Sequence, residues 1–121
     1  MILMGGVSLS IFKLETTQDK SQVYAPYIQS IDIEITNQGS DYFETLILVY
    51  GPDESLLFRG LYSLAPSVSI PIIGVGTYYN DFKVVLVTNV NTYANTAVNI
   101  ICWKEEDMIA IYTQEQMERY Y

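Results

Sequence analysis

The stretch that decides the fold of this chain reads SIDIEITNQGSDYFETLILVY and covers residues 30–50. Ile31, Ile33 and Ile35 alternate with polar residues. Because successive side chains of a β-strand point to opposite faces, this alternation separates an apolar face from a polar one. Residues 37–41 then interrupt the pattern with side chains typical of turns. Residues 42–50 are apolar at nearly every position, which is typical of a strand covered on both sides, so we expect a half-exposed strand that turns into a central one.

Similar short strands are expected along the rest of the chain. Turn signals such as Gly51-Pro52-Asp53-Glu54 and Ala65-Pro66-Ser67 separate them, and the internal Pro71 marks an edge strand. The expected strands cover residues 7–14, 22–27, 31–36, 42–50, 55–62, 68–72, 82–88, 96–104 and 108–112. About eight or nine strands at roughly ten-residue spacing predict an all-β fold, an antiparallel β-sandwich or jelly roll.

The length of 121 residues fits about one domain. With 50% hydrophobic and only 17% charged residues, the composition argues against a disordered tail or a coiled coil. Thr113 and Gln116 have the spacing of a capping box, which predicts a short helix at the end of the chain. We therefore expect three parts: an N-terminal arm or strand over residues 1–20, a β-sandwich domain over residues 21–112, and a short C-terminal helix or tail over residues 113–121.

The N-terminal strand, residues 7–14, lies between two loose segments. Gly5-Gly6 precedes it and a polar run over residues 15–21 follows it. Such a strand either pairs within its own domain or leaves and pairs with another subunit. In the second case it supplies main-chain hydrogen bonds and fills pockets at alternate positions.

The charge and residue content exclude several classes of function. The net charge is −8 with only six basic residues, and these form no cluster that could neutralise phosphates, so we expect no nucleic-acid partner. The chain contains no histidine, which removes the usual general base and the commonest metal ligand.

Nothing in the sequence predicts a membrane span or a classical secretion signal. No stretch approaches the roughly 18 apolar residues of a membrane helix. The segment Met1-Ile2-Leu3-Met4-Gly5-Gly6 is apolar, but it is too short for a signal peptide and lacks a basic region. An extracellular location would then be reached without a classical signal, for instance by lysis of the producing cell.

Carboxylates and hydroxyls give no catalytic pattern. The acidic groups Asp53-Glu54 and Glu105-Glu106-Asp107 fall in expected turns, and no calcium-binding loop is present. No Gly-x-Ser-x-Gly elbow occurs, and no histidine could activate a serine. We therefore predict no enzyme, no metal and no cofactor.

The single cysteine and the tyrosines leave alternatives open. Cys102 is either a buried core thiol or the site of one bond to a neighbouring subunit. Eleven tyrosines and one tryptophan suggest sugar binding, because aromatic rings stack on pyranose faces. The candidates in loops and at strand ends are Tyr78, Tyr79, Tyr93 and Trp103. Alternatively, these side chains serve the core or an interface.

Four short pieces of the chain resemble a family of small β-sandwich proteins on the spore surface of endospore-forming Firmicutes. The pieces are Ile33-Glu34-Ile35-Thr36-Asn37-Gln38-Gly39, Tyr50-Gly51-Pro52-Asp53, Leu64-Ala65-Pro66-Ser67 and Thr96-Ala97-Val98-Asn99-Ile100. The family is related in architecture to endospore appendage subunits, which polymerise by β-strand addition through an N-terminal arm. Some appendage subunits carry several cysteines that cross-link the fibre, whereas this chain has only Cys102. The resemblance therefore implies a polymer held mostly by non-covalent contacts.

The residues agree with assembly. Residues 42–50, 82–88 and 96–103 carry apolar side chains on both faces, whereas a two-layer sandwich has only one interior, so the surplus marks an interaction surface. We expect the N-terminal stretch to cross into a neighbour, with assembly contacts from Val7, Leu9, Ile11 and Phe12. The predicted function is a non-enzymatic structural protein that self-assembles with its own copies into a fibre or a surface layer. The first alternative is a β-sandwich module that binds carbohydrate or a receptor. The second is a hydrolase with two carboxylates facing each other across a cleft, although no feature of the sequence favours it.

Overall fold

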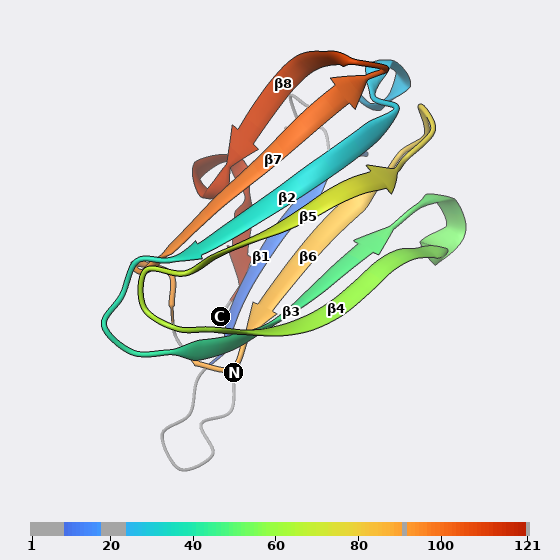
Figure 1. Cartoon of the computed structure of the whole chain (residues 1–121). Coiled ribbons are helices and arrows are strands. Elements are labelled where there is room, and N and C mark those ends of the chain that lie inside the picture. The colour runs from blue at the N-terminus through green and yellow to red at the C-terminus, as the bar shows by residue number, and fades with distance from the viewer. Residues whose placement is uncertain (1–8, 18–23, 91, 121) are drawn as a thin grey trace.

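The computed structural model of the chain describes residues 9–17, 24–90 and 92–120, and it is a two-layer antiparallel β-sandwich (Figure 1). The predicted all-β sandwich is confirmed. One sheet has five strands in the order β4-β3-β6-β1-β9, and the other has four in the order β5-β2-β7-β8. The strands are β1 (Ser10–Glu15), β2 (Ser30–Asn37), β3 (Phe43–Tyr50), β4 (Leu56–Leu64), β5 (Ser69–Gly76), β6 (Lys83–Thr88), β7 (Thr96–Lys104), β8 (Asp107–Thr113) and β9 (Glu118–Tyr120).

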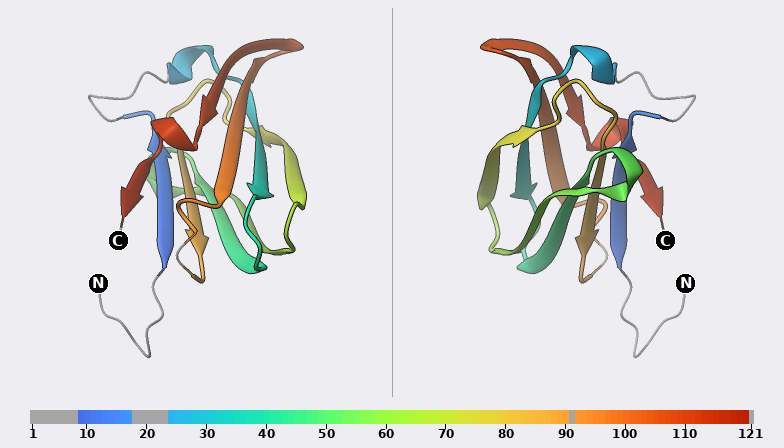
Figure 2. Two further views of the ribbon diagram at one scale, coloured as in Figure 1. Left: turned by 90° about the vertical axis from the view of Figure 1, so that its left-hand side faces the viewer. Right: turned by 90° about the vertical axis from the view of Figure 1, so that its right-hand side faces the viewer.

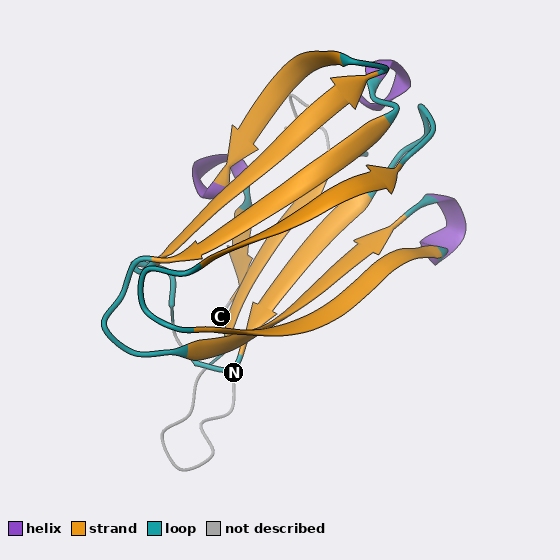
Figure 3. Cartoon of the chain, in the orientation of Figure 1, coloured by secondary structure: helices purple, strands orange, loops and turns teal. Residues whose placement is uncertain are grey.

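Within the described residues, three single turns of 3₁₀-helix lie between strands at the ends of the sandwich (Figure 3). They are η1 (Ala25–Tyr27), η2 (Pro52–Glu54) and η3 (Gln114–Gln116). The expected strand over residues 22–27 is therefore wrong where the structure describes it. Pro26 fixes a helical φ angle near the start of η1, and Tyr27 N–H donates to Tyr24 O over 3.1 Å, which closes a turn.

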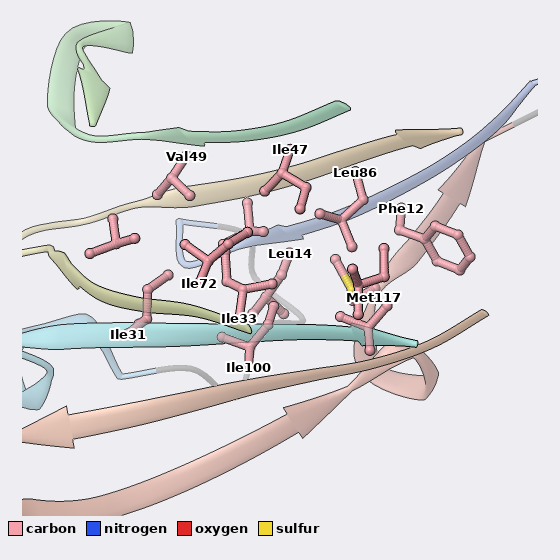
Figure 4. Packing of buried hydrophobic residues seen from close by; sticks show 14 of the residues in the cluster. Phe12, Leu14, Ile31, Ile33, Ile47, Val49, Ile72, Leu86, Ile100 and Met117 are labelled. Carbon is pink, nitrogen blue, oxygen red and sulfur yellow. The ribbon is translucent and has the colours of Figure 1, made fainter. Parts of the chain in front are cut away.

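The core lies between the sheets, where alternate residues of each interior strand point inward. Ile31, Ile33 and Ile35 of β2 are completely buried, and the polar residues between them are half-buried. Figure 4 shows Ile33 and Ile100 of one sheet facing Ile47 and Leu86 of the other. The alternation read from the sequence thus places the apolar face of β2 on the core.

Strand β3 is central in its sheet, between β4 and β6, as predicted. Its inward residues Ile47 and Val49 are completely buried. Its outward residues Leu46 and Leu48 are only half-buried, so the expectation of cover on both sides is wrong. The two layers have one interior, and the apolar surplus of β3 lies on the outer face of its sheet.

The N-terminal strand belongs to its own sandwich, which corrects the division at residue 20. β1 pairs with β6 from Ser10 opposite Thr88 to Glu15 opposite Lys83. Phe12 is completely buried and Leu14 nearly so. Both side views show β1 between β6 and the C-terminal strand (Figure 2). The long-range pairing with β6 holds β1 in place.

The C-terminal part also belongs to the sandwich. The capping box is confirmed: Thr113 N–H donates to Gln116 Oε1 over 2.7 Å, and Thr113 Oγ1 accepts from Glu115 N–H. The helix is a single turn, however, and the chain continues as β9 beside β1. Met117, between η3 and β9, is buried in the core, so residues 113–120 are no tail.

Candidate functional site

Four strands lie at sheet edges within the described residues, and two of them carry features that prevent further pairing. β5 contains Pro71, which has no main-chain N–H to donate to a further strand. β9 has only three residues and carries the charges of Glu118 and Arg119. A proline within an edge strand, or a very short and charged edge strand, disfavours pairing with another strand.

β8 forms the opposite edge of the four-stranded sheet and is less protected, because it contains no proline and pairs regularly with β7 over residues 110–113, beyond a register shift near its start. Its residues 108–113 include no charged side chain. Met108, Ile109 and Ile111 are 54%, 42% and 48% exposed. Ile101 and Trp103 of β7 lie half-buried beside them, with Ile101 directly opposite Ile111. We call these five residues the β8 patch.

β4 forms the edge of the five-stranded sheet. Leu56, Leu57 and Leu61 are exposed on it, and Arg59 is the only charged residue of the strand. Directly opposed residues continue from Leu61 through the neighbouring strands as an apolar row formed by Leu46, Val87 and Ile11. Next to this row lies a shallow hollow of about 220 Å³, lined mainly by Leu9, Leu46, Leu61 and Val87.

The strand orders place β4 and β8 at opposite sides of the sandwich. β4 lies beside β5, and β8 lies on the side of β9, to which it is linked through η3. Each of the two weakly protected edges therefore belongs to a different sheet and faces away from the other (Figures 1 and 2). A molecule with open edges on both sides can contact two neighbours at once.

The predicted assembly residues do not form an exchanged strand in the structure. Ile11 and Phe12 lie within β1 and pair with β6 of the same chain. Leu9 is 43% exposed and lines the hollow beside the apolar row. Val7 lies outside the described residues. Leu9 and Ile11 thus belong to an outer sheet surface, whereas Phe12 belongs to the core.

Of the predicted aromatic residues, Tyr78 and Tyr79 lie in an exposed loop between β5 and β6. Both have left-handed backbone angles, with φ of 52° and 65°, which non-glycine residues adopt only where their surroundings hold them. Their N–H groups donate to Gln29 O and Ile28 O over 2.8 Å. The Tyr78 ring also lies against Gly76, where a Cβ atom would come within 2.6 Å of it.

Ile28 and Gln29 directly follow η1, so this loop adjoins a second pair of exposed tyrosines, which the sequence pattern did not reveal. The rings of Tyr24 and Tyr27 stack with centroids 5.0 Å apart, and Lys104 Nζ lies 5.8 Å from the centre of the Tyr27 ring. We call Tyr24, Tyr27, Tyr78 and Tyr79 the tyrosine end. The two tyrosines that flank Ala25-Pro26 could have indicated this cluster. The strand expected over residues 22–27 did not predict that their side chains would be exposed.

Tyr93 and Trp103 do not join the tyrosine end. The Tyr93 hydroxyl accepts from Ile11 N–H over 2.8 Å and donates to Ile11 O over 3.2 Å, and its ring packs on Phe12. Trp103 Nε1 donates to Asp32 Oδ2 over 2.9 Å on the outer face of the four-stranded sheet. Both side chains therefore serve structural contacts, and the four predicted residues form no single sugar site.

Cys102 is a core residue. Its side chain is completely buried, and burial raises the pKa of the thiol from 9.0 to about 12. Burial also raises the pKa of Tyr112, with a smaller contribution from Cys102. A thiol enclosed in the core cannot reach a neighbouring subunit, so the alternative of an intersubunit bond is wrong for this fold.

The acidic side chains form no metal centre within the described residues. No three His, Cys, Asp or Glu side chains there are grouped so that they could hold a metal ion. Asp53 and Glu54 lie in the turn η2, as predicted, and Glu54 forms an ion pair with Lys83 at 3.0 Å. The described part of the chain also contains no helix long and apolar enough to span a membrane.

Comparisons with known proteins support the fold alone. No protein-family model matches the chain, and no curated protein matches it. It is similar to a solved structure from Thermotoga maritima, described as "Crystal Structure of Thermotoga maritima 1070", with a TM-score of 0.51 and 13% sequence identity. The similarity covers 91% of this chain and 92% of that one. At this low identity the similarity carries no activity, ligand or partner over to this chain.

Proposed function

We propose that this protein is a non-enzymatic structural protein whose copies self-assemble by β-strand addition at open sheet edges into a fibre or a layer. The observation that carries the proposal is β8, an edge strand with no charge over residues 108–113 and three exposed apolar side chains. The resemblance to endospore appendage subunits is the reason for proposing a cell or spore surface as its place.

Contrast within the molecule supports this reading of β8. An edge strand exposes unpaired N–H and C=O groups, and proteins that remain monomeric normally blunt such edges. β5 has a proline and β9 is short and charged. The same chain leaves β8 without a charge over residues 108–113 and β4 with only Arg59. Edges of this kind pair readily with further strands.

The positions of the two edges support growth beyond a dimer. A symmetric contact at one edge alone closes after two copies. A second contact at the opposite side, through β4, would add further copies on either side of that pair. Strand β1 takes no part in this version of assembly, because it is already paired with β6 and β9.

Electron microscopy of the purified full-length protein, combined with light scattering, tests the proposal. We expect filaments or ordered sheets from the wild-type chain. Ile111→Lys should strongly reduce assembly, because it places a charge on the β8 edge. The matched control is Ile73→Lys, an equally drastic change at a 77% exposed position on the proline-containing strand β5, which should assemble normally. A wild-type protein that stays monomeric at high concentration contradicts the proposal.

A second candidate function, binding of carbohydrate or of a receptor, is favoured by the tyrosine end. Tyr24, Tyr27 and Tyr78 are 62%, 55% and 70% exposed, and aromatic rings of this kind stack on ligands that are apolar on one face. Glycan-array binding that is lost in Tyr78→Ala would support it. Tyr42→Ala is the control, because Tyr42 is also 62% exposed but does not belong to the tyrosine end. Equal loss in both variants, or no binding at all, contradicts it.

A further inference from the structure

The hydrogen bonds of β7 determine which main-chain groups of β8 face outward. Val98 N–H donates to Gln114 Oε1 over 2.9 Å, so the main-chain N–H of this β7 residue points toward the β8 side. Main-chain direction alternates along an antiparallel strand. The main-chain N–H and C=O groups of Ile100 and Cys102 therefore also point toward β8, where these residues lie opposite Tyr112 and Ala110. Between these two, Ile111 turns its N–H and C=O groups away from β7.

Both flanks of Ile111 restrict the outward-facing stretch. On one side a register shift makes Ile109 an extra residue opposite the step from Cys102 to Trp103. On the other side Thr113 N–H donates to Gln116 Oε1 over 2.7 Å, so it is already occupied. Ile111 is thus at the centre of the regular part of this edge, and its side chain is exposed.

We infer that β8 pairs antiparallel with β8 of a second copy of this chain, about a two-fold axis at Ile111. This inference rests on the proposed assembly and specifies one of its contacts. The two Ile111 residues would exchange N–H···O bonds as a hydrogen-bonded pair. Ala110 of each copy lies opposite Tyr112 of the other, and the two four-stranded sheets become one continuous sheet.

Charge restricts where two copies can meet and bears on the direction of the pairing. The whole chain carries −8, which opposes contact between copies, and the uncharged residues 108–113 let two copies pair without like charges directly opposite each other. Parallel pairing in register would set Asp107 beside Asp107 of the second copy, which is unfavourable for directly opposed like charges. Antiparallel pairing moves these two carboxylates to opposite ends of the contact, where Asp107 of each copy comes level with Glu115 of the other, a residue that has Arg119 as an ion-pair partner at 3.8 Å. It also joins the two β8 patches.

Cysteine cross-linking tests the register. In the inferred pair the two Ile111 Cα atoms lie about 5.5 Å apart, within the range of roughly 4.4–6.8 Å for a disulfide. The two Ile109 Cα atoms lie about 14 Å apart, because four residue steps of about 3.3 Å along the strand add to the separation of about 5 Å between the strands. Mild oxidation should therefore give covalent dimers of Ile111→Cys at least tenfold faster than of Ile109→Cys. The native Cys102 stays silent, because it is buried with a pKa of about 12.

Each outcome is decisive, provided that circular dichroism shows both variants folded. Dimers from Ile111→Cys alone support the inference. Equal cross-linking of both variants points to parallel or random contacts, cross-linking of Ile109→Cys alone points to another register, and cross-linking of neither points to another surface, so each of these overturns it. Assembly without the Ile111→Cys cross-link would leave the proposed function standing, whereas cross-linked dimers that never grow would count against the fibre and not against this pair.

Discussion

Asn37 joins the central turn to the body of the sandwich. The side chain is completely buried. Its Nδ2 donates to Leu64 O and Asp41 O over 2.9 Å, and its Oδ1 accepts from Gly39 N–H over 2.9 Å. One side chain therefore satisfies three main-chain groups of the turn over residues 37–41 and of β4, and water has little access to replace it.

Asn37→Ala should lower the free energy of unfolding by about 2–4 kcal/mol, since three main-chain groups lose their side-chain partner and each one left buried without a partner costs about 1–3 kcal/mol. Urea unfolding followed by circular dichroism measures this. Gln38→Ala is the control, because the Gln38 side chain is exposed and should change the stability by less than about 0.5 kcal/mol. A similar small loss for Asn37→Ala would show that the turn does not depend on its side chain.

Cys102 should be chemically silent in the folded protein. Burial raises its pKa from 9.0 to about 12, and the thiolate is the reactive form. We expect no reaction with a thiol reagent at pH 8, and stoichiometric reaction after unfolding in urea. Rapid labelling of the native protein would show that the core opens at β7.

The raised pKa of Cys102 also makes the stability of the fold decrease at high pH. The folded pKa lies above the unfolded one, so the contribution of Cys102 to stability is fully present below pH 9 and decreases from there toward about pH 12, where only the unfolded thiol ionises readily. The raised pKa of Tyr112 acts in the same direction. Cys102→Ala should make the decrease above pH 9 shallower, which urea unfolding at a series of pH values measures.

At the scale of elements, the position of β1 distinguishes two versions of assembly. In the exchange version the N-terminal strand leaves its own fold, and changes in it affect polymers but not the domain. In the structure Phe12 of β1 is completely buried, and its ring lies 5.0 Å from the Tyr93 ring. Removal of the Phe12 side chain must therefore lower the stability of a single copy.

Phe12→Ala should reduce the stability by about 3–5 kcal/mol, the usual cost of removing a buried aromatic side chain. Ile11→Ala, on the half-buried outer face of the same strand, should cost clearly less. Thermal unfolding of both variants at low protein concentration gives the comparison. An unchanged melting temperature in Phe12→Ala would instead support the exchange version, in which the N-terminal strand leaves its own fold.

The different success of the sequence predictions for β2, β1 and η1 has a physical cause. Alternation along β2 specifies an apolar face whichever strand it pairs with, so Ile31, Ile33 and Ile35 were assigned to the core correctly. The pattern of β1 predicts a strand as well, but its partner β6 is more than 60 residues away, from Glu15 to Lys83. Only the tertiary pairing decides whether β1 stays within its own sheet. In η1, Pro26 and the hydrogen bond from Tyr27 to Tyr24 override strand propensity.

The candidate sites were less predictable, because exposure and edge position arise only when the sheets assemble. Residues 108–112 were expected as a strand, but nothing in their sequence states that β8 is last in its sheet. Likewise, Tyr78 and Tyr93 are the same residue type in the loops before and after β6, yet Tyr93 packs on Phe12 and Tyr78 is 70% exposed. Chain order does not distinguish them.

At the scale of the whole molecule, two forces oppose each other. The apolar outer surfaces at β4 and β8 favour contact between copies, whereas a net charge of −8 repels them over the Debye length. That length is about 30 Å at 0.01 M salt and about 10 Å at 0.1 M. Salt therefore weakens the repulsion and leaves apolar strand contacts largely intact.

Association should accordingly increase as sodium chloride is raised from about 0.01 M to about 0.3 M, and sedimentation velocity measures this. Ile111→Lys changes the net charge from −8 to −7, so repulsion alone would make this variant associate more readily than the wild type. If the β8 edge drives assembly, it associates less at every salt concentration, while Ile73→Lys, with the same charge of −7, behaves like the wild type or better. Association that decreases with salt would instead point to ion pairs between copies, and the open edges would then not be the cause.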